Sequence, residues 1–293
     1  MSRGLLFAFL AAFCWGVSPV LQKRALKDMG LLELNAVRGI GMLTVLLPAL
    51  FFLDAADVHL GVRSYSLLAL MALLINIVGD LFVFAAIRSI GVSLTSPIAS
   101  SYPLLVTFFS WRFFGEDMTA FVWGGTLLVV AGLVFLNIRK DGSGGRFHVR
   151  GVTMAALAAL CWALGLGMNK TLALGGVSST GITCWRGIFF GLMGVGCWAL
   201  SSLLRPGSTE RLSRIPAAGW LAGIGAAWVA LLVGGWFYAS SLFMIPLSVA
   251  TPIASSSPLI AALIACMFMD ERLRPLQWLG ILFVISGAVL VGM

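Results

Sequence analysis

One aspartate in this sequence lies where a charged side chain is costly. Asp80 is near the middle of the apolar run 65–88, whereas the other acidic residues lie in loops or at the ends of such runs. Withdrawing a carboxylate from water costs a few kcal/mol or more and favours its protonated form. We therefore treat Asp80 as a candidate proton carrier. The alternative is a purely structural ion pair with Arg38, Arg88 or Arg186.

Other polar residues share the predicted helical face of Asp80. Asn76, Asp80, Phe84 and Arg88 recur at steps of four, which places them above one another on a helix. The stripe contains an amide and a carboxylate and ends in a cation. In the internal repeat described below, the position that matches Asp80 is Gly235. An acidic group present only once would suit a coupling site.

Two arginines occupy similar places in two other apolar runs. Arg38 and Arg186 lie several residues past the starts of the runs 33–53 and 178–200. Long cationic side chains in such positions can reach back to the polar end of the run. They could instead line a central cavity, where they would bind an anionic substrate group or balance the charge of Asp80.

The most specific pattern is a repeated proline motif. Residues 97–101 (Pro-Ile-Ala-Ser-Ser) recur unchanged as 252–256, and a further proline follows each copy, at Pro103 or Pro258. A proline within a helix removes a backbone donor and kinks the chain. The serines beside it could satisfy the freed carbonyls or face a wet cavity. The alternative is a pair of bent helices that pack through small residues.

These patterns predict a substrate cavity with kinked helices as its gates. The predicted lining is Arg38, Asn76, Asp80, Ser100, Ser101, Tyr102, Arg186, Trp236, Tyr238, Ser255 and Ser256. The predicted gating kinks are Pro97, Pro103, Pro252 and Pro258. Tryptophan and tyrosine in such a cavity favour flat or aromatic solutes through stacking and cation–π contacts. Trp15 and Trp162 also match between the repeats, but the sequence does not fix the direction they face.

The sequence lacks the residue patterns that an enzyme active site would need. Both histidines, His59 and His148, lie in loops, and the five cysteines lie within apolar runs without metal-binding spacing. No P-loop, HExxH or Gly-x-Ser-x-Gly motif occurs. We expect no enzymatic activity, no cofactor, no metal and no disulfide. Any transport would be secondary or driven by a partner.

The elements that must position these residues are membrane helices. Apolar residues make up 60% of the chain and charged residues 10%, whereas ordinary domains average about 45–50% and about 25%. A helix needs about 20 apolar residues to cross the bilayer core. Ten such runs are present: 4–22, 33–53, 65–88, 93–113, 118–138, 151–173, 178–200, 217–242, 247–269 and 274–292. The sequence thus predicts an all-α membrane protein of ten transmembrane helices.

The chain is an internal duplication. The proline motif recurs at an offset of 155 residues, and Cys14-Trp15 recurs as Cys161-Trp162 at an offset of 147. Each half holds five runs, so the second half must enter the membrane from the opposite face, as an inverted repeat around a central cavity. We expect a first repeat over 1–140, a glycine-rich linker over 141–150 and the inverted repeat over 151–293.

The net charge of +8 indicates orientation rather than nucleic-acid binding, because the basic residues lie in loops and at the ends of the runs. Thirteen of them fall on the side of the odd-numbered loops and five on the other side. Cytoplasmic loops are enriched in Lys and Arg. This count predicts cytoplasmic odd-numbered loops and both termini in the periplasm.

Several further residues recur in both halves. Trp15-Gly16 is followed by Lys23, and an arginine lies early in the second and the seventh run, at Arg38 and Arg186. A proline pattern leads through an apolar run to an acidic turn in each half. It reads Tyr102-Pro103-Leu104 to Gly115-Glu116, and Ser257-Pro258-Leu259 to Asp270-Glu271-Arg272. With these residues the whole chain resembles the drug/metabolite transporter superfamily, EamA type.

The resemblance implies ten helices, a pseudo-two-fold axis and a central cavity between the halves. It also implies that the third, fourth, eighth and ninth helices line that cavity and that the substrate is exported from bacteria. The family usually has cytoplasmic termini and a basic second loop. In this chain the second loop is acidic, with Asp54 and Asp57, which departs from the family pattern.

We therefore expect a secondary transporter of the bacterial inner membrane that works as a monomer by alternating access. The expected substrates are small organic solutes, with amino acids, aromatic ones among them, ahead of organic cations or other metabolites. Protons would be a partner if Asp80 couples transport, and ion-free exchange is the alternative. A flippase or scramblase would instead need a polar groove open to the bilayer. A membrane scaffold would need neither Asp80 nor the paired kinks.

Overall fold

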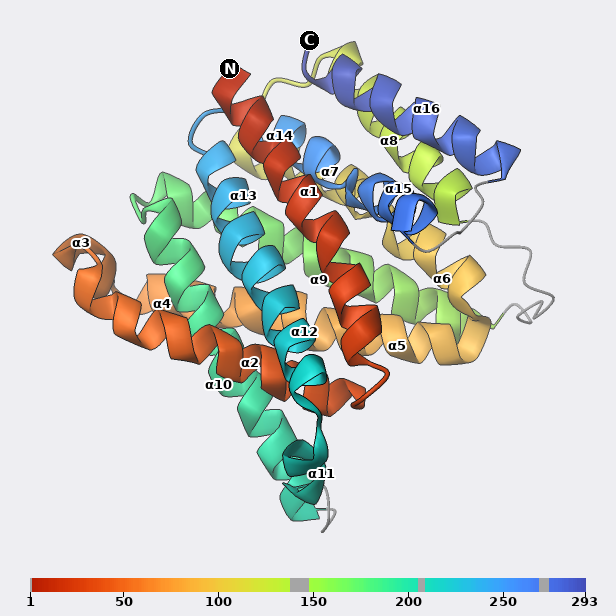
Figure 1. The fold of residues 1–293 in the computed structure, drawn as a ribbon. Helices are drawn as coiled ribbons and strands as arrows, with labels where there is room; N and C mark the ends of the chain where they lie inside the picture. The colour runs from red at the N-terminus through yellow and green to blue at the C-terminus, as the bar shows by residue number, and fades with distance from the viewer. Residues whose placement is uncertain (1, 138–147, 205–208, 269–273) are drawn as a thin grey trace.

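The computed structural model describes residues 2–137, 148–204, 209–268 and 274–293, and within these ranges the regular elements are all helices. Most of the predicted linker 141–150 and the acidic turn 270–272 lie outside the described residues. The all-helical prediction is confirmed for the described ranges. Figure 1 shows the helices crossing one another in a single bundle.

The first half comprises α1 (Ser2–Ala25), α2 (Leu31–Ala49), η1 (Leu50–Phe52), α3 (Ala55–Val58), α4 (Val62–Leu73), η2 (Leu74–Val78), α5 (Gly79–Ile90), α6 (Val92–Ala99), α7 (Tyr102–Phe114) and α8 (Ala120–Asn137). The second half comprises α9 (Val149–Leu174), α10 (Ser179–Leu204), α11 (Thr209–Arg214), α12 (Ala217–Ala227), η3 (Trp228–Gly234), α13 (Gly235–Ser241), α14 (Leu247–Ala254), α15 (Ser257–Phe268) and α16 (Pro275–Val291).

Eight helical stretches within the described residues are long and apolar enough to cross a membrane. They are Ser2–Ala25, Leu31–Phe52, Val62–Ile90, Ala120–Asn137, Val149–Leu174, Ser179–Leu204, Ala217–Ser241 and Leu247–Ile264. Of the two other predicted runs, Pro275–Val291 forms a shorter apolar helix. The run 93–113 is divided between α6 and α7 by a turn at Ser100 and Ser101, and the stretch Leu247–Ile264 contains a matching turn.

Each proline motif divides its run at the same place. The turn at Ser100 and Ser101 between α6 and α7 matches a turn at Ser255 and Ser256 between α14 and α15. Proline two residues later cannot donate a backbone hydrogen bond, and it sits at the start of the new helix, where that donor is not needed. The proline motif therefore ends one helix and starts another.

The third run of each half contains a π-helical segment, which the sequence analysis did not predict. In the first half it is η2, and in the second half it is η3, which covers the positions that match η2 at the 155-residue offset. A π-turn carries an extra residue and occurs often at functional sites. Both halves therefore widen the helix at the same depth of the repeat.

The first helix of each half packs mainly on the other half. The helix α1 contacts α12, η3, α13, α14 and α15, and Figure 1 shows it alongside α12 and α13. The helix α9 contacts chiefly α4, η2, α5, α6 and α7. This exchange joins the two halves around a common centre.

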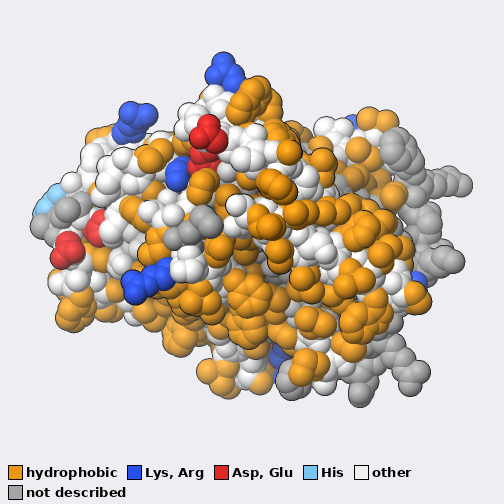
Figure 2. Space-filling model, turned by 90° about the horizontal axis from the view of Figure 1, so that it is seen from above, with side chains coloured by type: hydrophobic (Ala, Val, Ile, Leu, Met, Phe, Trp, Pro, Cys, Tyr) orange, Lys and Arg blue, Asp and Glu red, His pale blue; other side chains and the backbone are white. Residues whose placement is uncertain are grey.

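The outer helices pack in pairs through small residues. A Cβ at Gly132 of α8 would lie 2.6 Å from the Gly280 carbonyl oxygen of α16, and α16 lies along α8 in Figure 1. Such close backbone approach is the usual way in which helices associate in lipid. Figure 2 shows many orange apolar side chains spread over the visible face and few charged ones, as a lipid-facing surface would have.

Candidate functional site

A cavity of about 340 Å³ lies where the interrupted helices meet. It is lined by Trp15, Ser18, Pro19, Gln22, Ile75, Asn76, Ser100, Tyr102, Leu133, Trp162, Leu166, Arg186, Ala230, Leu231, Ser255, Ser257 and Pro258. The two π-segments and the two proline-motif turns all contribute to this lining. Backbone that departs from a regular helix at membrane depth is tolerated where it lines such a cavity.

Two tryptophans hold the π-segments at the cavity. Trp15 of α1 donates its indole N–H to the Ala230 carbonyl oxygen in η3 at 3.0 Å. Trp162 of α9 donates to the Ile75 carbonyl oxygen in η2 at 3.2 Å. The donors are 147 residues apart and the acceptors 155, which are the two repeat offsets. Each first helix thus satisfies a carbonyl of the opposite half.

Aromatic rings form much of the apolar wall. The rings of Tyr102 and Trp162 meet edge to face with centroids 5.8 Å apart. Trp15 packs against Tyr238 at 5.2 Å. The Tyr102–Trp162 contact has the edge-to-face geometry that aromatic pairs prefer. The wall could bind the apolar or aromatic part of a solute.

The serines of the two turns serve the backbone. The hydroxyls of Ser101, Ser255 and Ser256 each donate at 2.7 Å to the carbonyl oxygen three residues earlier. Ser100 and Ser255 line the cavity, whereas Ser101 and Ser256 are outside its lining. Satisfying these carbonyls is the role that the sequence analysis allowed for the serines.

Arg186 is the one charged residue in the described lining of the cavity. Only 5% of its surface is exposed. Its Nη2 donates to the carbonyl oxygen of Leu231 in η3 at 2.9 Å. Among the described residues the guanidinium has no carboxylate within ion-pair distance.

Asp80 and Arg38 lie outside the lining. Asp80 is half-buried in the first turn of α5 and makes no hydrogen bond or ion pair with another described residue. Arg38 is buried, donates to Asn35 Oδ1 at 3.1 Å and lies over the Phe190 ring at 5.3 Å. Asp80 and Arg38 interact electrostatically without direct contact.

Trp236 and Tyr238 also lie outside the lining. Trp236 donates its indole N–H to Thr180 Oγ1 at 3.1 Å. Tyr238 is fully buried, and its hydroxyl shares a hydrogen bond with Thr251 Oγ1 at 2.7 Å. The structure therefore brings together Asn76, Ser100, Tyr102, Arg186 and Ser255 of the predicted lining, but not the remaining six residues.

Sequence reasoning left several lining residues out of its predicted site. Ser18, Pro19 and Gln22 of α1 share one helical face with Trp15, at steps of three and four. The signal that could have found them was the matched pair of tryptophans, whose polar N–H groups needed partners in the membrane. Leu133 and Leu166 carry no such signal.

The cavity joins an open depression at one end. Pro19 and Gln22 line both the cavity and an open depression with Lys23, Leu26 and Lys27 at the C-terminal end of α1. The opposite end is packed by a buried apolar cluster that includes Ala8, Ala11, Tyr238, Leu242, Ile245 and Leu247. A solute could therefore enter from one side of this conformation.

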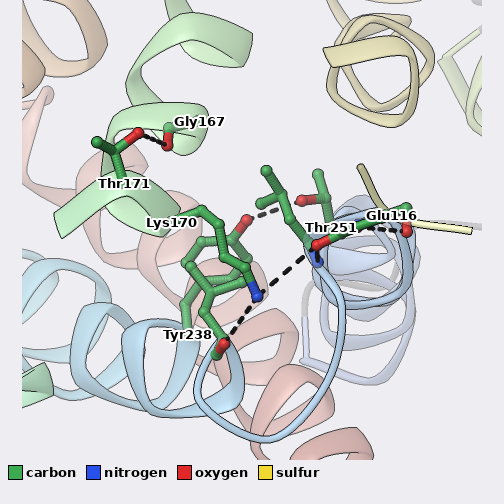
Figure 3. A network of polar contacts seen from close by, with 9 residues as sticks. Glu116, Gly167, Lys170, Thr171, Tyr238 and Thr251 are labelled. Atoms are coloured by element: carbon green, nitrogen blue, oxygen red, sulfur yellow. Dashed lines mark hydrogen bonds and ion pairs between the residues drawn. The ribbon is translucent and has the colours of Figure 1, made fainter. Parts of the chain in front are cut away.

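A polar network, drawn in Figure 3, contacts Leu242 and Leu247 of this apolar cluster. The helix α7 ends at Phe114, and Gly115 follows with a φ of 62° that favours glycine, just before Glu116. The Glu116 carboxylate accepts hydrogen bonds from the backbone N–H groups of Leu247 and Ser248 at 2.7 and 2.9 Å, and from the Ser248 hydroxyl at 2.7 Å. It therefore caps the positive end of α14.

Lys170 joins this network from α9. Its Nζ lies 3.7 Å from Glu116 Oε1 and donates to the Leu242 carbonyl oxygen at 3.1 Å. Figure 3 shows Lys170 at the centre of this network, with Thr251 and Glu116 to its right. The network thus connects α7, α9, α13 and α14 at the closed end of the cavity.

The eight long apolar helical stretches among the described residues are those of a multi-pass membrane protein. Comparison with known proteins places it more narrowly: a model of the EamA-like transporter family matches residues 2–138 and again 149–293. The chain belongs to this family and is therefore a transporter that handles a small-molecule substrate, and not an enzyme. The resemblance predicted from the sequence is confirmed.

Curated relatives cover most of the chain. It is 25% identical to "Uncharacterized transporter YwfM" of Bacillus subtilis (strain 168), over 98% of this chain and 92% of that protein. It is 26% identical to "Probable amino-acid metabolite efflux pump" of Escherichia coli (strain K12), over 96% and 91%. An "Uncharacterized transporter" of Archaeoglobus fulgidus is 29% identical, but the match spans only 56% of that relative and 55% of this chain.

A solved structure titled "Crystal structure of protein" has the same fold. The TM-score is 0.80, with 16% sequence identity, over 99% of this chain and 96% of the other. At this identity the likeness bears on the fold alone.

The closed end provides a test of the Glu116 network. We expect Glu116→Gln to lower stability by about 1–3 kcal/mol, because charge-assisted hydrogen bonds to the start of α14 become weaker neutral ones. Thermal unfolding of the purified protein in detergent measures the loss. The control is Asp117→Asn at the next residue, which is exposed. Equal melting temperatures for the two variants would contradict the capping role.

Proposed function

We propose that the chain is a secondary transporter that exports small organic solutes, with amino acids first among them, across the bacterial inner membrane by alternating access. The observation that carries this proposal is the cavity that is open at the C-terminal end of α1 and closed by packing at the other end. A central site accessible from one side at a time is what alternating access requires.

The two halves are, in this proposal, inverted repeats of five membrane spans each. The separate family matches to 2–138 and 149–293 support a duplication. The paired hydrogen bonds of Trp15 to Ala230 and of Trp162 to Ile75 support a symmetric exchange of the first helices. The broken run α6–α7 and the short helix α16 would complete the ten spans.

The gates in this proposal are the two broken runs. The turns at Ser100–Ser101 and Ser255–Ser256 give each run a point about which its two helices can change angle. In the present conformation Glu116 and Lys170 would hold α14 against α7 and α9. Release of that network would open the packed end to the solute.

Amino acids lead the expected substrates for two reasons. One relative is named a "Probable amino-acid metabolite efflux pump". The cavity combines aromatic rings with a few polar groups, as small-molecule sites generally do. The proposal further includes a monomeric unit and termini in the periplasm, the latter from the charge count alone.

The direct test is counterflow in proteoliposomes of the purified full-length protein. Radiolabelled phenylalanine, tryptophan, leucine and alanine are offered outside against each unlabelled solute inside. We expect saturable exchange of at least one amino acid. A Tyr102→Ala variant should raise its KM, because the ring forms part of the cavity wall.

Two results would count against this function. If no amino acid exchanges but an organic cation or another metabolite does, the amino-acid assignment fails and the transporter stands. If fluorescent lipids cross between the leaflets and no solute exchanges, the function is lipid handling and not the export of solutes.

Proton coupling through Asp80 is a separate part of the proposal. Asp80 is the sole carboxylate well inside an apolar run of the first half, and it has no direct partner among the described residues. We expect Asp80→Asn to abolish the stimulation of uptake by an imposed pH gradient while exchange at zero gradient continues. Transport driven equally well by the gradient in both proteins would remove Asp80 from the coupling.

A further inference from the structure

We propose that Arg186 binds a carboxylate of the transported solute and thereby selects carboxylate-bearing substrates over organic cations. The proposal rests on the transport function and names the substrate class of the same cavity. It follows from a difference between the two halves in the surroundings of two matched arginines.

The first of these arginines, Arg38, interacts with groups of the protein itself. Asp80 supplies a nearby negative charge, Asn35 accepts a hydrogen bond, and the Phe190 ring faces the guanidinium. Arg38 is not part of the cavity lining. Arg38 therefore has a nearby counter-charge within the fold, although the two side chains form no ion pair.

The second arginine differs in this respect. The position that matches Asp80 in the second half is Gly235. A Cβ added at Gly235 would collide with Arg186 Nη2, so the guanidinium occupies the space into which an acidic side chain there would have to grow. Among the residues that the structure describes, no carboxylate replaces it within ion-pair distance.

A buried charge without a counter-charge is costly, and an anionic ligand would remove that cost. One N–H of the Arg186 guanidinium is used by the Leu231 carbonyl, out of the five donors that arginine carries. The remaining donors can form the two parallel hydrogen bonds that guanidinium makes with a carboxylate. Arg186 faces the cavity, so a solute in the cavity can provide that carboxylate.

Asn76 adds a second free polar group to the same cavity. It is 6% exposed, its Oδ1 has no hydrogen-bond partner, and the amide makes no hydrogen bond to another described residue. In the second half the matching residue is Leu231. An amide oxygen can accept from an ammonium group. Arg186 and Asn76 together fit an α-amino acid, with the apolar side chain against Trp162 and Tyr102.

The charge of the cavity lining disfavours organic cations as substrates. The described lining contains one cation and no carboxylate. An organic cation would bring a second positive charge next to Arg186 without a counter-charge, and like charges at close range repel strongly in a poorly solvated site. The cavity therefore favours zwitterions and monoanions.

The test compares solutes that differ only in the carboxylate. Phenylalanine and leucine are measured against phenylalaninamide and leucinamide by counterflow, and the same solutes are tested for raising the melting temperature of the protein in detergent. Tetraphenylphosphonium serves as the cation. We expect the acids to exceed the amides by about tenfold or more in kcat/KM, a ratio that Arg186→Gln abolishes and Arg186→Lys partly keeps.

Two further variants keep the test decisive. Arg38→Gln removes the matched buried arginine outside the lining and should leave the acid-to-amide ratio as in the unmodified chain. Gly235→Ala retains the charge but displaces the guanidinium, so it should raise the KM for the acids. It also gives a result if Arg186→Gln does not fold.

The outcomes separate this proposal from the transport function. Amides transported as well as acids, or transport of tetraphenylphosphonium alone, would overturn the role of Arg186 and leave the transporter standing. An acid-specific rise in melting temperature that needs Arg186, without any exchange, would support the site and overturn the transport function. Neither exchange nor a melting-temperature shift with any acid would overturn both.

Discussion

The structure depends on one constraint, the need to satisfy backbone polar groups without water inside a membrane. Four segments of this chain depart from regular helix near one point: η2, η3 and the two proline-motif turns. Each departure frees carbonyl groups, and each finds donors close by. Trp15, Trp162 and Arg186 serve the π-segments, and the serine hydroxyls serve the turns. The cavity is the space that these interruptions leave.

The same arrangement links the two halves and gives the molecule its two ends. Each first helix donates to the π-segment of the other half, and these two hydrogen bonds join the halves at the cavity. At one end the Glu116 carboxylate fixes the start of α14, and Lys170 ties it to α9. At the other end the cavity continues to Lys23 at the C-terminal end of α1. A solute site between a closed and an open end follows from this asymmetry.

The sequence predicted the helical class and the break at each proline motif, because apolar run lengths and proline chemistry are local properties. It did not predict the π-segments, since an extra residue in one turn leaves no trace in apolar composition. Such a residue rotates the following face by about 100°. Asn76 and Asp80 therefore do not share one helical face, and Asn76 lies in the cavity lining whereas Asp80 lies outside it. The contact of Glu116 with Leu247 could not be predicted either, because the two residues are 131 positions apart in the sequence.

The most direct test of the central claim is the accessibility of one cavity residue from each side of the membrane. A single cysteine at Ser257, which lines the cavity, in a chain without its five native cysteines, is treated with a membrane-impermeant thiol reagent in vesicles of either orientation. Alternating access predicts modification from one side in the resting protein and a shift toward the other side when the transported solute is present. Equal modification from both sides at once, or modification that no solute changes, would contradict alternating access through this cavity.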